Sequence, residues 1–178
     1  MLDFQSYLFL LARQNRLAKQ LGFHPCLCSG MAGLEGVLES LQDHDRFICI
    51  DDTTDGHVEQ LRSGGYFTTR VCTVFILARY DYADTRQRLD RLTECRKLFR
   101  QLHSRLILDE EQLHSESLYL DVNSIRYKEL GQYTADGLTG LFFMLTLREP
   151  TDLCFHAEEW DMSIHADTFT NQFTTKFD

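Results

Sequence analysis

Soft metal ligands gather in one short stretch near the start of the chain, His24-Pro-Cys26-Leu-Cys28. Imidazole and thiolate groups are ligands that zinc readily takes in proteins. A structural zinc site needs four of them, and this stretch has neither a fourth ligand nor a Cys-x-x-Cys pair. We therefore interpret it as a loop with two buried thiols, and we predict no metal ligand in it.

A second stretch, Asp51-Asp52-Thr-Thr-Asp55-Gly56, resembles the first half of a calcium-binding loop. The twelfth position counted from Asp51 is Arg62, where such a loop requires a bidentate glutamate. This mismatch rules out an EF-hand and favours an exposed acidic loop. We interpret Asp51, Asp52 and Asp55 as candidate contacts with a second subunit or another partner.

Other patterns that would indicate an enzyme are weak. Asp51 or Asp52 at a strand end could join Asp121 in a two-metal nuclease, but no accompanying Lys, His or Glu pattern supports this. No G-x-S-x-G or G-x-x-x-x-G-K motif is present. Cys72 and Cys95 lie in apolar runs, which favour packing over nucleophilic catalysis. The sequence therefore predicts no catalytic, cofactor-binding or metal-ligating residue, and no cofactor.

The overall composition is that of one compact domain. The chain has 178 residues, of which 43% are hydrophobic and 25% charged. With 27 acidic and 18 basic residues the net charge is −9, which disfavours sequence-specific nucleic-acid binding. Four of the six cysteines lie in apolar runs, as free thiols commonly do; they are Cys49, Cys72, Cys95 and Cys154. The absence of a secretory signal or a long apolar run predicts no membrane partner and synthesis in a reducing cytoplasm.

The clearest structural pattern runs from residue 64 to residue 106. Residues 66–80 are rich in β-branched and aromatic side chains and predict a strand covered on both faces. Asp84 or Thr85 can cap the helix that follows. Its apolar side recurs every three or four residues and is expected to lie on a sheet; it comprises Leu89, Leu92, Cys95 or Arg96, Phe99, Leu102 and Leu106.

The other elements are predicted from weaker patterns. We expect helices at 2–21, which Gly22 would end, and at 30–42. Strands are expected at 46–52, 117–127 and 137–147, with a loop at 51–65, a charged break at 109–111, a turn at 130–136 and Pro150 ending the last strand. The order ααββαββ indicates an α/β (α+β) fold, a small mixed sheet of about four strands backed by helices. Residues 1–150 would form the domain and residues 151–178 a C-terminal extension or arm.

The C-terminal tail is polar but carries Phe169, Phe173 and Phe177, which lie four residues apart. Such a segment has too few apolar residues to form a hydrophobic core of its own. We interpret the three phenylalanines as candidate contacts of an arm that docks on another subunit, with a frayed terminus as the alternative.

The element order and size resemble the tail-terminator (tail-completion) proteins of long-tailed phages and prophages. The likeness rests on the opening helix, the strand at 46–52 with its acidic exit loop, the strand at 66–80 leading into the helix at 84–106, and the strand at 137–147. It covers residues 2–150 and involves no specific motif. The resemblance implies a hexameric ring that caps a tail tube, with tail-tube or head-completion proteins as partners, in the host cytoplasm and then in the virion.

These observations favour a non-enzymatic assembly protein that self-associates through complementary surfaces. Two alternatives remain open from the sequence. One is a small metal-dependent nuclease or other enzyme of a mobile element, and the other is an acidic protein-binding adaptor. A pocket in which acidic residues converge with a histidine would favour the enzyme. A shallow surface with exposed loops and apolar arms would favour assembly.

Overall fold

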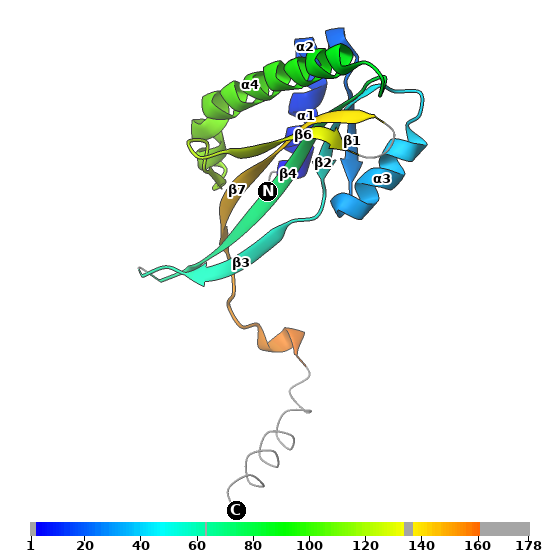
Figure 1. Ribbon diagram of the computed structural model, residues 1–178. Helices are drawn as coiled ribbons and strands as arrows, with labels where there is room; N and C mark the ends of the chain where they lie inside the picture. Colours follow the sequence, from blue (N-terminus) through cyan, green and yellow to red (C-terminus); the bar gives the residue numbers. More distant parts are fainter. Residues whose placement is uncertain (1–2, 63, 134–136, 161–178) are drawn as a thin grey trace, which may run out of the picture.

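The computed structural model describes residues 3–62, 64–133 and 137–160, and its centre is a mixed sheet flanked by helices (Figure 1). The strands are β1 (His24–Cys28), β2 (Arg46–Asp51), β3 (Asp55–Gln60), β4 (Tyr66–Arg79), β5 (Tyr119–Leu120), β6 (Arg126–Tyr133) and β7 (Leu138–Thr151). The helices are α1 (Phe4–Gln14), α2 (Arg16–Leu21), α3 (Gly30–Ser40), α4 (Thr85–Ser115) and a 3-10 turn, η1 (Ala157–Glu159). The predicted α+β class is confirmed, but the sheet has seven strands in the described residues rather than about four.

Strands β4 and β7 form the spine of the sheet. They pair antiparallel over 14 residues each, from Tyr66 opposite Thr151 to Arg79 opposite Leu138. The order across the sheet is β1-β2-β4-β7-β5, and β1 runs parallel to β2. β3 continues along the first half of β4, and β6 lies along the first half of β7. The long central strand expected at 66–80 is confirmed.

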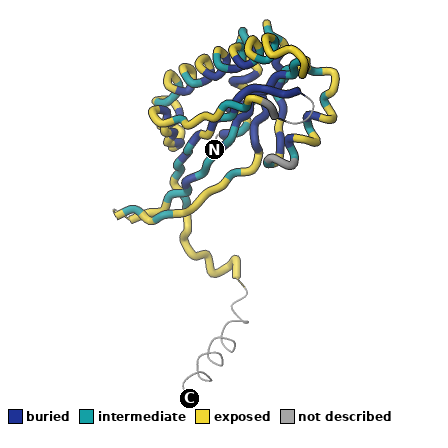
Figure 2. Tube along the Cα trace, viewed as in Figure 1, coloured by how far each residue is buried: buried dark blue, intermediate teal, exposed yellow. Residues whose placement is uncertain are grey.

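The two faces of the sheet have separate hydrophobic cores. Ile48, Ile76 and Phe143 point to the face covered by α1 and α4. Phe47, Phe75 and Leu77 point to the opposite face, where α3 covers part of the sheet. This alternation follows from the two-residue period of a strand. The near-continuous apolar runs of β2 and β4 exist because both of their faces are buried within the body of the molecule (Figure 2).

The single helix expected at 2–21 is two helices that meet at Asn15. The Asn15 backbone is extended, with φ −65° and ψ 121°, so the helical path stops there. The Asn15 N–H donates a hydrogen bond to the Leu11 carbonyl and so completes the last turn of α1. Its side-chain oxygen accepts a hydrogen bond from the Ala18 N–H at 2.8 Å, which caps α2. Gly22 ends α2 in the left-handed region, with φ 76°, as expected.

The helix expected to end at residue 106 continues to Ser115, so the charged break predicted at 109–111 is wrong. Asp84 caps its start by accepting a hydrogen bond from the Gln87 N–H, as expected. Leu92, Cys95, Phe99, Leu102 and Leu106 are buried along it, whereas Leu89, predicted on the same stripe, is about half exposed. In the last turns Leu113 is buried in the core, and Asp109, inside the predicted break, has partners on both α1 and α4.

The loop expected at 51–65 contains strand β3. Gly64 and Gly65, with φ 83° and 82°, form the turn that joins β3 to β4. The hairpin extends away from the body of the molecule (Figure 1). Nearly every side chain of β3 is exposed, so its sequence lacks the apolar alternation on which strand prediction depends.

Two later boundaries also differ. The strand expected at 117–127 is replaced by the short β5 and the separate β6, which takes in part of the turn expected at 130–136. The last predicted strand is confirmed, but β7 runs through Pro150 to Thr151. Proline fits there because β5 reaches only as far as Arg148, so one edge of β7 has no strand beside it at Pro150.

Candidate functional site

Asp51, a predicted partner contact, lies in the interior at the end of β2. One oxygen of its carboxylate accepts hydrogen bonds from the Gly30 N–H at 2.9 Å, the Thr53 N–H at 3.0 Å and the Thr53 hydroxyl at 2.7 Å. The side chain therefore joins the start of α3 to the turn after β2. The role of Asp51 is therefore structural, because its carboxylate is buried and already accepts hydrogen bonds from Gly30 and Thr53.

Asp52 and Asp55 are exposed, as expected of contact residues. Asp52 accepts a hydrogen bond from the Ser29 hydroxyl at 3.0 Å. It also borders an open hollow of about 410 Å³ beside α1 and β1, lined by Asp3, Gln5, Ser6, Phe9 and Leu27. Asp55 begins β3, opposite Val71. The two carboxylates thus lie at the base of the projecting hairpin.

The carboxylates considered for a two-metal nuclease do not converge. Asp51 ends β2, whereas Asp121 follows β5, three strands away in the order β2-β4-β7-β5. At the usual strand spacing this separates them by about 14 Å or more. A two-metal site needs ligands around ions about 4 Å apart, so Asp51 and Asp121 cannot share one.

The thiol-rich stretch is strand β1 rather than a loop, and its two cysteines are buried as expected. His24, Cys26 and Cys28 are alternate residues on one face, and alternate residues in a strand are about 6.8 Å apart. That spacing is too wide for three neighbours on one strand to surround a single ion. The Cys26 sulfur instead lies 3.0 Å from that of Cys49 on β2, and His24 stacks on His44. Within the described parts of the chain, no three His, Cys, Asp or Glu side chains are grouped to hold a metal.

The remaining thiols are suited to packing. Burial raises the pKa of Cys72 to about 11 and that of Cys95 to about 12. Both are therefore protonated near neutral pH, and the thiol is a poor nucleophile in that form. Cys154 departs from the prediction: its apolar run does not bury it, and the thiol is exposed.

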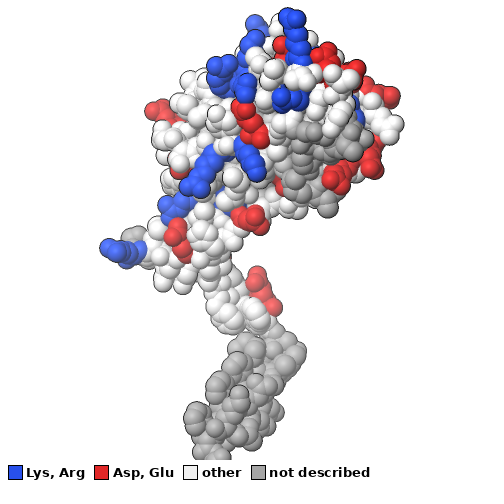
Figure 3. Space-filling model, in the orientation of Figure 1, with Lys and Arg blue, Asp and Glu red and all other residues white. Residues whose placement is uncertain are grey.

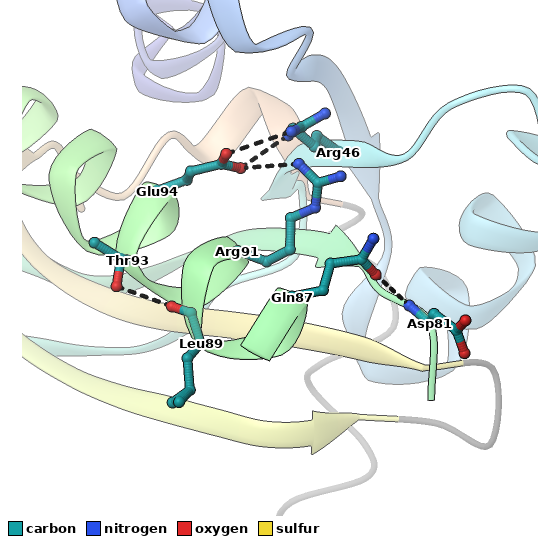
Figure 4. A network of polar contacts seen from close by, with 7 residues as sticks. All are labelled: Arg46, Asp81, Gln87, Leu89, Arg91, Thr93 and Glu94. Atoms are coloured by element: carbon teal, nitrogen blue, oxygen red, sulfur yellow. Dashed lines mark hydrogen bonds and ion pairs between the residues drawn. The ribbon is translucent and has the colours of Figure 1, made fainter. Parts of the chain in front are cut away.

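Glu94 forms a polar link between α4 and β2 (Figure 4), and Arg96 of α4 forms another with Glu129 of β6, at 2.6 Å. The Glu94 carboxylate accepts hydrogen bonds from Arg46 at the start of β2, at 3.0 Å, and from Arg91 on α4, at 3.3 Å. A separate contact lies nearby, in which the Gln87 side chain accepts a hydrogen bond from the Asp81 N–H. All these groups tie the start of α4 to neighbouring segments, so the network has a structural role.

The most unusual surface is the projecting part of the sheet, which consists of β3, residues 66–70 of β4 and residues 148–151 of β7. From here on we call this part of the sheet the arm; it is distinct from the C-terminal arm expected at residues 151–178. Within residues 3–62, 64–133 and 137–160, no helix covers the arm (Figure 1). Ion pairs hold it together across strands, Arg148 with Glu59 and Arg70 with Glu149, and the Arg148 guanidinium lies 5.5 Å from the centre of the Phe67 ring. Val58 is half exposed on the arm, with no core beneath it.

The arm leads into residues 152–160, which we call the terminal segment. All nine of its residues are exposed. They include Leu153 at 53%, Phe155 at 65% and Trp160 at 57%, and the two aromatic rings stack on each other at 6.2 Å. Burying a large apolar side chain is worth about 1.5–3 kcal/mol. The terminal segment is therefore the strongest candidate for contact with a partner, and we did not single out these three residues from sequence.

Phe169, Phe173 and Phe177, the other predicted contacts, lie outside the described residues. In the part of the chain that is described, no helix is both long and apolar enough to cross a bilayer. Comparison of the sequence with models of known protein families gave no match, and comparison with curated proteins gave none either.

Proposed function

We propose that this chain is a non-enzymatic assembly protein, a tail-terminator-like subunit that closes a ring on the end of a phage or prophage tail tube. One observation carries the proposal. The arm leaves the body of the molecule and continues into the terminal segment, where Leu153, Phe155 and Trp160 are exposed. Apolar side chains placed beyond the domain's own core suit contact with another subunit.

The sheet supports a head-to-tail mode of association. β1 forms one edge, with Pro25 in it, whereas β5 and β6 lie at the other edge. The two edges therefore present different surfaces. A contact between different surfaces repeats from copy to copy and closes a ring when the rotation allows it.

On this proposal the protein works by geometry, and no residue has a catalytic role. Its partners are other copies of the chain and the tail-tube or head-completion proteins at the tube end. It is made in the cytoplasm of the host bacterium and ends in the virion.

The test is the mass of the protein in solution, measured by sedimentation velocity over a range of concentrations. The full chain should form a closed oligomer of hexamer mass at high concentration or on adding a tail-tube protein. A variant ending at Thr151 should keep the same melting temperature but associate more weakly, because residues 152–160, the described part of what it removes, are all exposed.

Point variants separate the contribution of the terminal segment from the effect of truncation. Phe155→Ser with Trp160→Ser should weaken association, whereas Tyr82→Ser, which changes an equally exposed aromatic residue before α4, should not. A full chain that stays monomeric at every concentration and leaves tail-tube assembly unaffected would overturn the proposal.

A further inference from the structure

Charge is distributed unevenly between two parts of the chain that lie on opposite sides of the sheet. Residues 29–60, which include α3, contain eight acidic residues and one arginine. Residues 85–105, most of α4, contain seven basic residues and two acidic ones. Figure 3 shows red side chains mainly on the side where α3 lies and blue ones mainly over α4 and the strands beside it.

The outer side of α4 has a continuous exposed stripe. Its residues follow one another at helical spacings of three or four and lie opposite the buried side of the helix. We call these residues the basic stripe: Arg86, Leu89, Thr93, Lys97, Arg100, Ser104, Ile107 and Leu108. The exposed Asp90 lies beside it, and the exposed Glu111 follows its end. The three cations of the stripe form no ion pair with any other described residue. Apolar side chains lie toward both ends, Leu89 at one and Ile107 with Leu108, the latter 73% exposed, at the other.

The other side of the molecule has an exposed acidic ridge that follows α3. Glu35 and Glu39 are four residues apart on the outer side of this helix. We call the following residues the acidic ridge: Glu35, Glu39, Asp43, Asp45, Asp52 and Asp55. None of them is ion-paired within the described portions of the chain. Carboxylates grouped in this way repel one another, so a basic surface laid against them would be stabilised.

The basic stripe and the acidic ridge cannot meet within one subunit, because α4 and α3 pack on opposite faces of the sheet. We propose that the basic stripe of one copy binds the acidic ridge of a second copy. Each pair then leaves one stripe and one ridge free for further copies, which is the condition for growth into a ring. This inference rests on the proposed assembly function and adds a pair of helix surfaces to the terminal segment and the sheet edges as contacts between copies.

Two charge-reversal variants test the pairing. The first is R86E/K97E/R100E, which makes the stripe acidic, and the second is E35K/E39K/D43K, which makes the ridge basic. Each alone should associate about tenfold or more weakly than the wild type, because like charges then face each other. Wild-type association should also weaken as salt is raised.

An equal mixture of the two variants should assemble again. In the mixture the acidic ridge of the first variant faces the basic stripe of the second, and the two reversed surfaces also match. A chain carrying all six changes should assemble by itself for the same reason. Both cases also bring the average net charge back to the wild-type value of −9. The ridge variant alone therefore separates specific pairing from net charge, because its negative charge is smaller than that of the wild type and it should still associate more weakly.

The control variant is R13E/R16E/K19E, which lowers the net charge by the same amount as the stripe variant, at exposed residues of α1 and α2 that lie outside the stripe, the ridge and the edges of the sheet. It should associate like the wild type. Equal weakening by the control, or no recovery in the mixture, would overturn the inference.

Other outcomes separate this inference from the function on which it rests. If the wild type assembles and neither reversal affects it, the pairing is wrong while the assembly function stands. If the wild type stays monomeric even at low salt and ignores a tail-tube protein, both fail. If the R86E/K97E/R100E variant loses binding to duplex DNA but associates like the wild type, the basic stripe binds nucleic acid. The proposed pairing of the stripe with the ridge is then overturned.

Discussion

Tyr7 and Asp109, 102 residues apart in the chain, are joined by a hydrogen bond in which the phenol donates to the carboxylate at 2.8 Å. The same carboxylate oxygen accepts a hydrogen bond from Arg105 at 2.7 Å. Tyr7 belongs to α1 and Asp109 to the second half of α4. The bond therefore fixes the position of the first helix against the longest one.

Replacing Tyr7 with phenylalanine should lower the free energy of unfolding by about 1.5–3 kcal/mol, the usual contribution of a hydrogen bond to a charged group. Burial, and then the bond to Asp109, raise the pKa of Tyr7 above its ordinary value of 10.0. The wild-type advantage should thus be complete below pH 10 and fall above it, where the unfolded chain loses the phenol proton first. Urea unfolding at neutral and alkaline pH measures this. Tyr82→Phe, at an exposed position, should change little.

Phe99→Ala should destabilise the chain by about 3–5 kcal/mol. The ring is 8% exposed and packs between Tyr127 and Phe143, with both ring centres 5.1 Å away. Arg100→Ala, at the next residue but on the solvent side, should change the unfolding free energy of the monomer by no more than about 0.5 kcal/mol. Thermal and urea unfolding of both variants give the comparison. Equal losses would mean that the buried side of α4 is wrongly assigned.

Gly140→Ala should destabilise by about 3 kcal/mol or more. Gly140 has φ 152°, and an added Cβ would lie 2.0 Å from the Ile76 carbonyl oxygen on β4. The matched control is Gly36→Ala on an exposed side of α3, where a Cβ meets nothing within 4 Å. That change should stabilise by about 0.5–1 kcal/mol. Similar unfolding midpoints for the two variants would contradict this account of the β4–β7 pairing.

Under native conditions a thiol reagent should modify Cys154 first, because the other five cysteines are buried. The neighbouring Asp152 raises the pKa of Cys154. The fast reaction should therefore accelerate as pH rises and more thiolate forms. Timed mass spectrometry after alkylation counts the fast sites. In Cys154→Ser the fast phase should vanish, and a second thiol that reacts as quickly would show that part of the core opens readily.

The elements that could be predicted from the sequence are those with a regular spacing of apolar residues, because that spacing follows from burial of one or both sides of the element. β4, β7 and the first part of α4, up to Leu106, have strong apolar patterns because a core covers them. β3 was missed because Asp55–Gln60 has both faces exposed. At Asn15 the break accompanies a hydrogen bond between its side chain and the Ala18 N–H, and past residue 109 the long-range bond of Tyr7 with Asp109 joins α4 to α1. A pattern of residue types along the chain does not contain such partners. Leu113, buried seven residues after Leu106, does continue the apolar side of α4 and was not used in the prediction.

The candidate contact surfaces are harder to predict than the fold. The sequence marks the acidic residues at 51–55, yet only the structure separates the buried Asp51 from the exposed Asp52 and Asp55. Leu153, Phe155 and Trp160 gave no periodic pattern, so their exposure could not be inferred. The opposed positions of the basic stripe and the acidic ridge depend on which face of the sheet each helix covers, and that is decided by packing.

The full-length pairing of β4 with β7 has a mechanical consequence. The two strands run without interruption from the core to the arm, over about 45 Å at the usual rise per residue. A pull on one strand along its axis would load their hydrogen bonds together in shear, rather than opening them one at a time from an end. A force applied to the arm should therefore reach the core through these strands with little bending of the sheet.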